Sequence, residues 1–201
     1  PLAEESFKYV YENIKEDVCL SSIAGGTDMV GCLVLGNLYS AVYGGEIQGQ
    51  SLGIDVDVFT NDGKSTKDGE KGELVVKQPF PSMPVKFWGD DGGEKYHNAY
   101  FTRFNNIWHH GDFIERTNNN GFIMRGRSDA TLNPGGVRIG TSEIYQQVED
   151  IDFITEGLVV GQNYNDDVRI VLFITTKDNK KINKEEIKLI KSKIKKNCSP
   201  K

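Results

Sequence analysis

The sequence lacks most of the features that mark a secreted or membrane protein. Its 201 residues include only three cysteines, Cys19, Cys32 and Cys198, which are widely spaced and form no Cys-x-x-Cys pair. Neither a disulfide framework nor a zinc site is indicated. No apolar run approaches the roughly 20 residues that span a bilayer, and the N-terminus does not resemble a secretory signal. We therefore expect a protein of the reducing cytosol.

Composition and charge indicate a folded chain. Hydrophobic residues make up 37% and aromatic residues 10% of the sequence, which suits a buried core and argues against disorder. The net charge is −5, from 24 Lys+Arg and 29 Asp+Glu. Near the C-terminus, Ile187, Ile190 and Ile194 recur at helical spacing among many lysines. This pattern is typical of an amphipathic helix with solvated lysines, and without interleaved aromatics it does not favour nucleic-acid binding.

The apolar pattern predicts an α/β protein with a β-rich first part. A short helix over 7–14 precedes expected strands at 18–23, 54–58, 73–77, 112–116 and 122–125, the last two forming a hairpin. In the strand at 54–58, Asp55 and Asp57 alternate with apolar residues, which predicts a half-exposed strand. A helix capped by Thr141 or Ser142, strands at 158–161 and 168–176, and a final helix capped by Asn183 then predict a small α+β unit. We expect the boundary between Ser128 and Asp129. Because the chain opens without Met, we also expect a fragment of a longer protein.

The first of three clusters that could carry chemistry is the stretch 21–28, Ser-Ser-Ile-Ala-Gly-Gly-Thr-Asp. Its glycines permit close backbone approach, and a hydroxyl and a carboxylate follow at once. Such a turn can hold a phosphate oxygen and a magnesium ion. The alternative is a Gly-Gly turn with a purely structural role.

The second cluster is Trp108-His109-His110-Gly111-Asp112, followed by Arg127 at the far end of the expected hairpin. A carboxylate at the start of a hairpin strand can accept hydrogen bonds from both hydroxyls of a ribose, and Arg127 could face it. A structural salt bridge is the alternative. A metal site on the two histidines is disfavoured, because neighbouring residues of a strand point to opposite faces.

The third cluster, residues 126–140, joins the hairpin to the following helix and contains Arg127, Asp129 and Arg138 among glycines and a proline. A plain linker explains the glycines and the proline but not the two arginines. The sequence contains no Gly-x-Ser-x-Gly, P-loop or His-Glu-x-x-His motif, which leaves a hydrolase triad unsupported.

In order and spacing, the three clusters resemble the adenylate-forming acyl-CoA synthetase superfamily over essentially the whole chain. The matching elements are the turn Gly25-Gly26-Thr27-Asp28, Gly111-Asp112, and the segment Gly126-Arg127-x-Asp129 with Gly136-x-Arg138. Members of this superfamily activate a carboxylic acid with ATP to an acyl-adenylate and transfer the acyl group to coenzyme A. The resemblance implies their fold, with residues 1–128 closing a large nucleotide-binding domain and residues 129–201 beginning a small mobile one.

The resemblance also implies roles for individual residues. Thr27 and Arg138 would be catalytic, Asp28 would hold Mg²⁺, and Asp129 would be the hinge of the small domain. The nucleotide-binding residues would be Ser22, Ile23, Ala24, Gly25, Gly26, Thr27, Asp112, Arg127 and Arg138. Among these, Asp112 and Arg127 would bind the ribose, and Arg138 would approach phosphate or coenzyme A according to the rotation of the small domain.

Gly25 would also belong to the acyl pocket. Acetate-activating members carry a Trp at this position, so the resemblance implies room for a longer acid such as acetoacetate. The alternatives are a ligase for another short acid such as butyrate and a non-catalytic nucleotide-binding module. The phosphate loop and the late catalytic lysine of the superfamily have no counterpart in the sequence. We therefore expect the 201 residues alone to be inactive, and the oligomeric state is left open.

Overall fold

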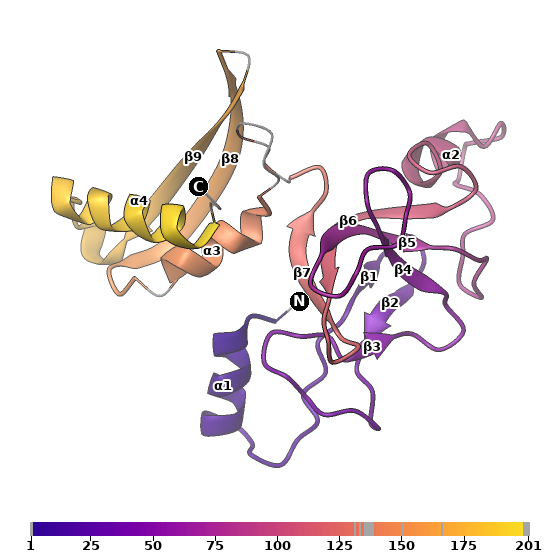
Figure 1. Cartoon of the computed structure of the whole chain (residues 1–201), viewed down its shortest axis with the longest axis horizontal. Helices are drawn as coiled ribbons and strands as arrows, with labels where there is room; N and C mark the ends of the chain where they lie inside the picture. Colours follow the sequence, from indigo (N-terminus) through magenta and orange to yellow (C-terminus); the bar gives the residue numbers. More distant parts are fainter. Residues whose placement is uncertain are drawn as a thin grey trace. The chain divides into compact units, whose positions relative to one another are not determined.

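The computed structural model describes residues 2–130, 132, 134, 139–149, 151–165 and 167–198. The chain divides into two compact units, Pro1–Met124 and Arg125–Lys201 (Figure 1). That these units are parts of two domains divided at residue 128 stays a prediction. No described helix is long and apolar enough to cross a membrane.

In its described part, the first unit is built from two small antiparallel sheets and two short helices. Strands β1 (Ala24–Gly26), β2 (Gly31–Leu35) and β3 (Gly49–Gln50) form one sheet, in the order β1-β2-β3. Strands β4 (Val56–Phe59), β5 (Lys71–Val76), β6 (Trp108–Arg116) and β7 (Phe122–Arg127) form the other, in chain order. The helices are α1 (Glu4–Asn13) and α2 (Glu94–Tyr100).

One hydrophobic core joins the two sheets of the first unit. Backbone hydrogen bonds in both directions between Ile47 and Phe122 connect the loop before β3 to β7. The hairpin of β6 and β7 is confirmed, and both strands are longer than expected. Buried core members from both sheets include Leu33, Val34, Val58, Leu74, Trp108 and Ile114.

Three details of the first unit differ from the predictions. No strand forms over 18–23, because these residues pair with no neighbouring strand; Val18 and Ile23 are exposed, and β1 begins only at Ala24. The first helix ends at Asn13, which leaves Ile14 exposed. The strand expected to be half exposed around 54–58 is instead β4, whose four residues are all buried.

The carboxylate of Asp57 can be buried in β4 because other side chains form ion pairs and a hydrogen bond with it. Arg116 Nη2 lies 2.7 Å from Oδ1, Lys77 Nζ lies 3.3 Å from Oδ2, and the Ser65 hydroxyl donates to Oδ2 at 2.7 Å. Burial acts to raise the pKa of Asp57. The hydrogen bonds from Ser65 and the Val58 amide, together with the charge of Lys77, outweigh burial and hold the pKa below its usual value.

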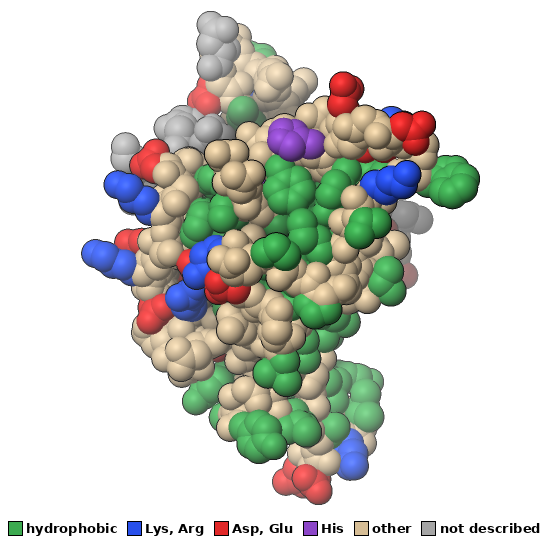
Figure 2. Space-filling view, turned by 90° about the vertical axis from the view of Figure 1, so that its right-hand side faces the viewer, with side chains coloured by type: hydrophobic (Ala, Val, Ile, Leu, Met, Phe, Trp, Pro, Cys, Tyr) green, Lys and Arg blue, Asp and Glu red, His purple; other side chains and the backbone are tan. Residues whose placement is uncertain are grey.

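Large apolar side chains are also exposed in the first unit. Trp88, Leu52 and Tyr39 are almost completely accessible to solvent. Figure 2 shows a face on which hydrophobic side chains gather through the middle and lower part. Apolar side chains that gather on an exposed face are typical of a contact surface.

The second unit has the predicted α+β character. Strands β8 (Ile154–Tyr164) and β9 (Asp167–Thr176) form a long antiparallel hairpin, and both strands exceed their expected lengths. Helices α3 (Thr141–Glu149) and α4 (Lys184–Cys198) pack against it, and a short 3-10 helix, η2 (Lys177–Asn179), precedes α4. The buried contacts between helices and hairpin include Ile144, Val148, Val159 and Ile190.

The predicted cap is confirmed for α4 and wrong for α3. Asn183 Oδ1 accepts hydrogen bonds from the amides of Glu185 and Glu186, and Glu186 Oε2 accepts one from the Asn183 amide, all at 2.9 Å. This is the reciprocal pattern of a capping box. Helix α3 already includes Thr141, and the buried hydroxyl of Ser142 has no hydrogen-bond partner among the described residues.

Replacing Asp57 by Ala should lower the free energy of unfolding by roughly 2–4 kcal/mol, because two cations lose the buried carboxylate that they share. Asp55→Ala is the matched control: it removes the half-exposed second partner of Lys77, and should cost less than about 1 kcal/mol. Urea unfolding measures both values. Equal losses for the two variants would contradict the role given to Asp57.

The contribution of Asp57 to stability should also depend on pH. Because its pKa is lower in the folded than in the unfolded chain, the contribution is complete above the unfolded value of about 3.9 and is lost as the pH falls through the folded value. The stability difference between the parent and Asp57→Asn should therefore be constant from pH 7 to about pH 5 and shrink below about pH 4. A difference that grows in acid would overturn this assignment.

Candidate nucleotide-binding site

The Gly-Gly-Thr-Asp segment forms the end of β1 and the turn into β2. The two strands pair antiparallel, with Gly26 opposite Gly31. The turn is closed by the Val30 amide, which donates to the Thr27 carbonyl at 3.1 Å. Thr27 and Asp28 are both exposed in this turn. The Thr27 hydroxyl and the Asp28 carboxylate thus lie exposed next to two glycines, which carry no side chain of their own.

A hollow of about 530 Å³ opens beside this turn. Six of the predicted nucleotide-binding residues contribute to its wall, five from the stretch 23–27 and one, Asp112, from β6. The tertiary structure therefore brings two of the predicted clusters to one concave surface. The full lining is Ile23, Ala24, Gly25, Gly26, Thr27, Gly31, Cys32, Asp112 and Met124.

Asp112 supplies the carboxylate of this hollow. Its side chain is only 10% exposed, and its Oδ2 lies 3.6 Å from Nε2 of the buried His110. The indole Nε1 of Trp108 in turn donates to His110 Nδ1 at 3.2 Å. Charge-assisted hydrogen bonds to a carboxylate are stronger than neutral ones. Asp112 is therefore suited to accept hydrogen bonds from hydroxyl groups of a ligand in the hollow.

The two adjacent histidines face opposite sides of β6, as the sequence predicts. His109 Nε2 lies 3.0 Å from Oε2 of Glu73, which is fully buried, whereas His110 contacts Trp108 and Asp112. Within the described ranges, no group of three His, Cys, Asp or Glu side chains is arranged to hold a metal ion. The two imidazoles therefore make different contacts, one with Glu73 and one with Trp108 and Asp112.

Asp28, the predicted magnesium ligand, lies exposed in the turn beside the hollow. The hydroxyl of Tyr100 donates a hydrogen bond to its Oδ2. A carboxylate has about four acceptor positions, so this bond leaves it able to bind a cation. Mg²⁺ commonly takes one or two protein carboxylates and completes its shell with water and substrate phosphates. A single exposed aspartate beside the hollow fits that preference.

The remaining predicted site residues do not line the hollow. Ser22 is buried, and its hydroxyl accepts a hydrogen bond from the Leu2 amide at 2.9 Å, so its nucleotide contact stays a prediction. Arg127 and Asp129 belong to the second unit, where Arg127 Nε lies 3.6 Å from Asp129 Oδ1 and both side chains are largely exposed. Arg138 lies outside the described residues. The expected pairing of Asp112 with Arg127 also stays a prediction.

Sequence reasoning missed three residues of the lining and one neighbour of Asp28. Gly31 and Cys32 follow from the β1–β2 register, which becomes visible once the strand is taken to begin at Ala24. Met124 could be placed from the hairpin that carries Asp112. Nothing in the sequence connects Tyr100 with Asp28, because their contact joins α2 to a turn far away in the chain.

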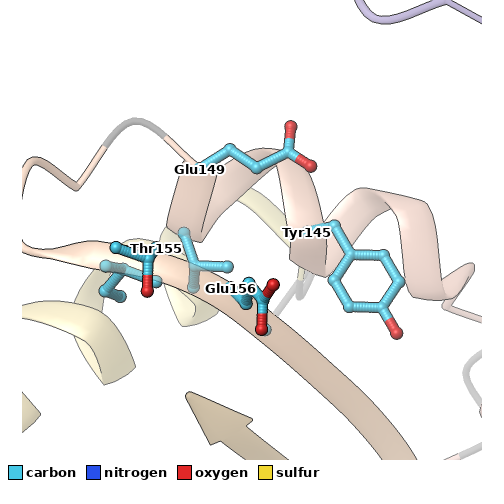
Figure 3. Close-up of a pocket in the computed structure, with 7 residues that line it drawn as sticks. Tyr145, Glu149, Thr155 and Glu156 are labelled. Atoms are coloured by element: carbon cyan, nitrogen blue, oxygen red, sulfur yellow. The ribbon is translucent and has the colours of Figure 1, made fainter. Parts of the chain in front are cut away.

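A second hollow, of about 300 Å³, lies in the second unit between α3 and β8 (Figure 3). Figure 3 shows Tyr145 and Glu149 on the helix and Thr155 and Glu156 on the strand. The lining is completed by Val148, Ile154 and Gly157. None of these residues belongs to the predicted nucleotide-binding set, so the hollow beside β1 is the candidate site.

Known proteins with similar sequences share one name. No protein-family model matches the chain. Acetoacetyl-coenzyme A synthetase of Rhizobium meliloti (strain 1021) is 54% identical over 200 residues, covering 100% of this chain and 31% of that protein. Acetoacetyl-CoA synthetase of Xenopus tropicalis is 43% identical over 196 residues, covering 96% and 29% respectively. The chain thus spans less than a third of the length of these relatives.

Solved structures agree with the sequence relatives. Acetoacetyl-CoA synthetase from Streptomyces lividans matches with a TM-score of 0.86 at 35% identity, over 100% of this chain and 30% of that one. The anthranilate CoA ligase AuaEII in complex with anthranoyl-AMP matches with a TM-score of 0.74 over 96% and 36%; at 16% identity this shows a shared fold. The chain therefore has the fold of the adenylate-forming acyl-CoA ligases and is homologous, over its whole length, to one segment of the acetoacetyl-CoA synthetases.

Proposed function

We propose that the chain is part of an AMP-forming acid–thiol ligase that converts acetoacetate to acetoacetyl-CoA through an acyl-adenylate. The observation that carries the proposal is the hollow beside β1, where the Gly-Gly-Thr-Asp turn and the buried Asp112 lie around one surface. The 54% identity to an acetoacetyl-coenzyme A synthetase supports the choice of reaction. ATP, acetoacetate and coenzyme A are the proposed substrates.

The turn after β1 is the proposed phosphate side of the site. In the adenylation step a carboxylate oxygen attacks the α-phosphorus of ATP and pyrophosphate leaves. Negative charge develops on phosphate oxygens in this step, and fixed donors around that charge lower the barrier. The Thr27 hydroxyl is exposed at this place, next to glycines that let a phosphate approach the backbone. Bound Mg²⁺ would neutralise phosphate charge, with Asp28 as its protein ligand.

Asp112 is the proposed ribose ligand. A carboxylate can accept one hydrogen bond on each oxygen, which matches the two adjacent hydroxyls of a ribose. Its burial makes those bonds stronger than they would be in water. The distance between Asp112 and the turn would then determine where the α-phosphate lies relative to Thr27.

Three residues of the second unit have proposed roles that follow from the resemblance. Arg127 would help to bind the ribose, Asp129 would be the hinge, and Arg138 would serve phosphate in one orientation and coenzyme A in the other. A largely exposed Asp129 side chain and a neighbouring glycine, Gly126, with φ of +119° are compatible with a hinge. Adenylate formation and transfer to coenzyme A use different partners. A rotation of the small domain would let different residues complete the same site in each half-reaction.

Gly25 is proposed to belong to the acyl pocket, and the backbone of β2 lies close to it. A Cβ at Gly25 would lie 2.1 Å from the Gly31 carbonyl oxygen and 2.6 Å from Cys32 Cα. The backbone of β2 fills that direction, so a larger side chain at this position requires β1 and β2 to move apart. Gly25 lines the hollow by its backbone. The proposed preference for acetoacetate therefore rests on the relatives.

The proposed compartment is the cytosol. Cys19, Cys32 and Cys198 form no disulfide with one another; Cys19 is exposed, Cys32 is partly buried and Cys198 is buried. Free thiols are typical of proteins in a reducing compartment.

Carboxylate-dependent exchange between ATP and labelled pyrophosphate tests the proposed reaction. With the protein in its full natural length, acetoacetate should support faster exchange than acetate or butyrate. Faster exchange with butyrate would instead identify a ligase for another short acid. No exchange with any acid would favour a non-catalytic nucleotide-binding module.

Gly25→Ala should destabilise the first unit by roughly 1–3 kcal/mol, because the new methyl group overlaps the backbone of β2. Gly49→Ala in β3 of the same sheet is the matched control, since nothing lies within 4 Å of a Cβ added there. Its cost should stay below about 1 kcal/mol. Chemical unfolding compares the two, and equal stabilities would show that β1 and β2 do not approach as closely as described.

A further inference from the structure

Trp108 is the centre of an aromatic cluster in the first unit. Its ring stacks on Tyr100, with 3.6 Å between centroids and 12° between planes. Phe80 and Phe101 contact it edge-on, at centroid distances of 5.4 and 6.0 Å. The side chain is buried. An indole packed on its face and edges has a fixed orientation, so its N–H points in a fixed direction.

The fixed indole selects the tautomer of His110. Trp108 Nε1 lies 3.2 Å from His110 Nδ1. An indole nitrogen can only donate, so Nδ1 must be the acceptor. In the neutral imidazole the proton is then on Nε2.

The protonated Nε2 faces Asp112. The distance from Nε2 to Oδ2 is 3.6 Å, and both side chains are buried. At this separation the attraction is electrostatic, and a movement of a few tenths of an ångström would turn it into a hydrogen bond. The attraction acts at low dielectric, where it is stronger than in water.

His110 also contacts the last residue of β1, directly before the turn. A Cβ at Gly26 would lie 2.9 Å from Cε1 and 3.5 Å from Nε2 of His110. The imidazole therefore packs directly against the backbone of β1, at a place where only glycine leaves room. One ring thus touches both walls of the hollow, the turn through Gly26 and β6 through Asp112.

We propose that His110 is a positioning residue of the nucleotide site. Its Nε2–H holds the Asp112 carboxylate in the orientation that accepts the ribose hydroxyls, and its ring sets the distance from that carboxylate to the phosphate turn. Trp108 acts on Asp112 indirectly, by fixing the tautomer of His110. This inference rests on the proposed function, because it takes Asp112 as the ribose ligand.

The test is the KM for ATP in the pyrophosphate-exchange reaction of the full-length protein. His110→Ala should raise that KM about tenfold and leave the KM for acetoacetate within about twofold, because both contacts of His110, with Asp112 and with Gly26, position the nucleotide. His110→Gln, whose amide can place a donor near the position of Nε2, should restore most of the loss. Trp108→Phe keeps an aromatic ring without the donor and should show part of the effect.

Deoxynucleotides distinguish a positioning role of His110 from a purely structural one. With 2′-deoxy-ATP or 3′-deoxy-ATP the parent has already lost one ribose contact, so His110→Ala should raise KM only about threefold or less. His109→Gln is the matched control, since the adjacent histidine faces Glu73 and should leave all KM values unchanged. Thermal unfolding of each variant measures whether the fold is retained.

Each outcome separates the inference from the proposed function. An unchanged KM for ATP in His110→Ala, or an equal rise for ATP and both deoxynucleotides, overturns the positioning role. Asp112→Asn decides which idea fails. If that variant leaves the KM for ATP unchanged, the ribose assignment itself is wrong. If it raises the KM and His110→Ala does not, only the role of His110 is refuted.

Discussion

The close approach of β1 and β2 constrains every part of the candidate site. Gly25 lies so near to the backbone of Gly31 and Cys32 that even a methyl group has no space. This contact holds the turn that presents Thr27 and Asp28, because the two strands lead directly into and out of it. On its other side the same strand packs through Gly26 on His110. Two consecutive glycines therefore place β1 between β2 and the imidazole, and thereby set its distance from β6.

Buried acids in the first unit have partners of different kinds. Asp57 lies 2.7 Å from Arg116, and Glu73 lies 3.3 Å from Arg103 and 3.0 Å from His109. A guanidinium can occupy a carboxylate with two strong donors, whereas an imidazole offers one. Asp57 and Glu73 stabilise the four-stranded sheet through such guanidinium pairs. Asp112 lies at the wall of the hollow, beside the imidazole of His110, at the place proposed for the ribose.

Much of the fold follows from local patterns in the chain. The capping box at Asn183, the apolar spacing in α4 and the hairpin that carries Asp112 depend on residues close in sequence, so periodicity and turn chemistry predict them. The strand expected at 18–23 failed because a strand requires a partner, and these residues have none. Asp57 was expected to be exposed by alternation, but its burial depends on Arg116, which lies two strands away.

The residue types that could bind a nucleotide are evident from the chain alone: a glycine turn with a hydroxyl and a carboxylate, and an aspartate opening a hairpin strand. Their order in the chain is enough to indicate the superfamily. Folding is needed to bring Asp112 and the turn to one hollow, to place Gly25 against β2, and to pack Trp108 and His110 beside Asp112. The reason is physical: chemistry of a side chain is local, whereas burial, close approach and the tautomer of an imidazole depend on neighbours that folding brings from distant parts of the chain.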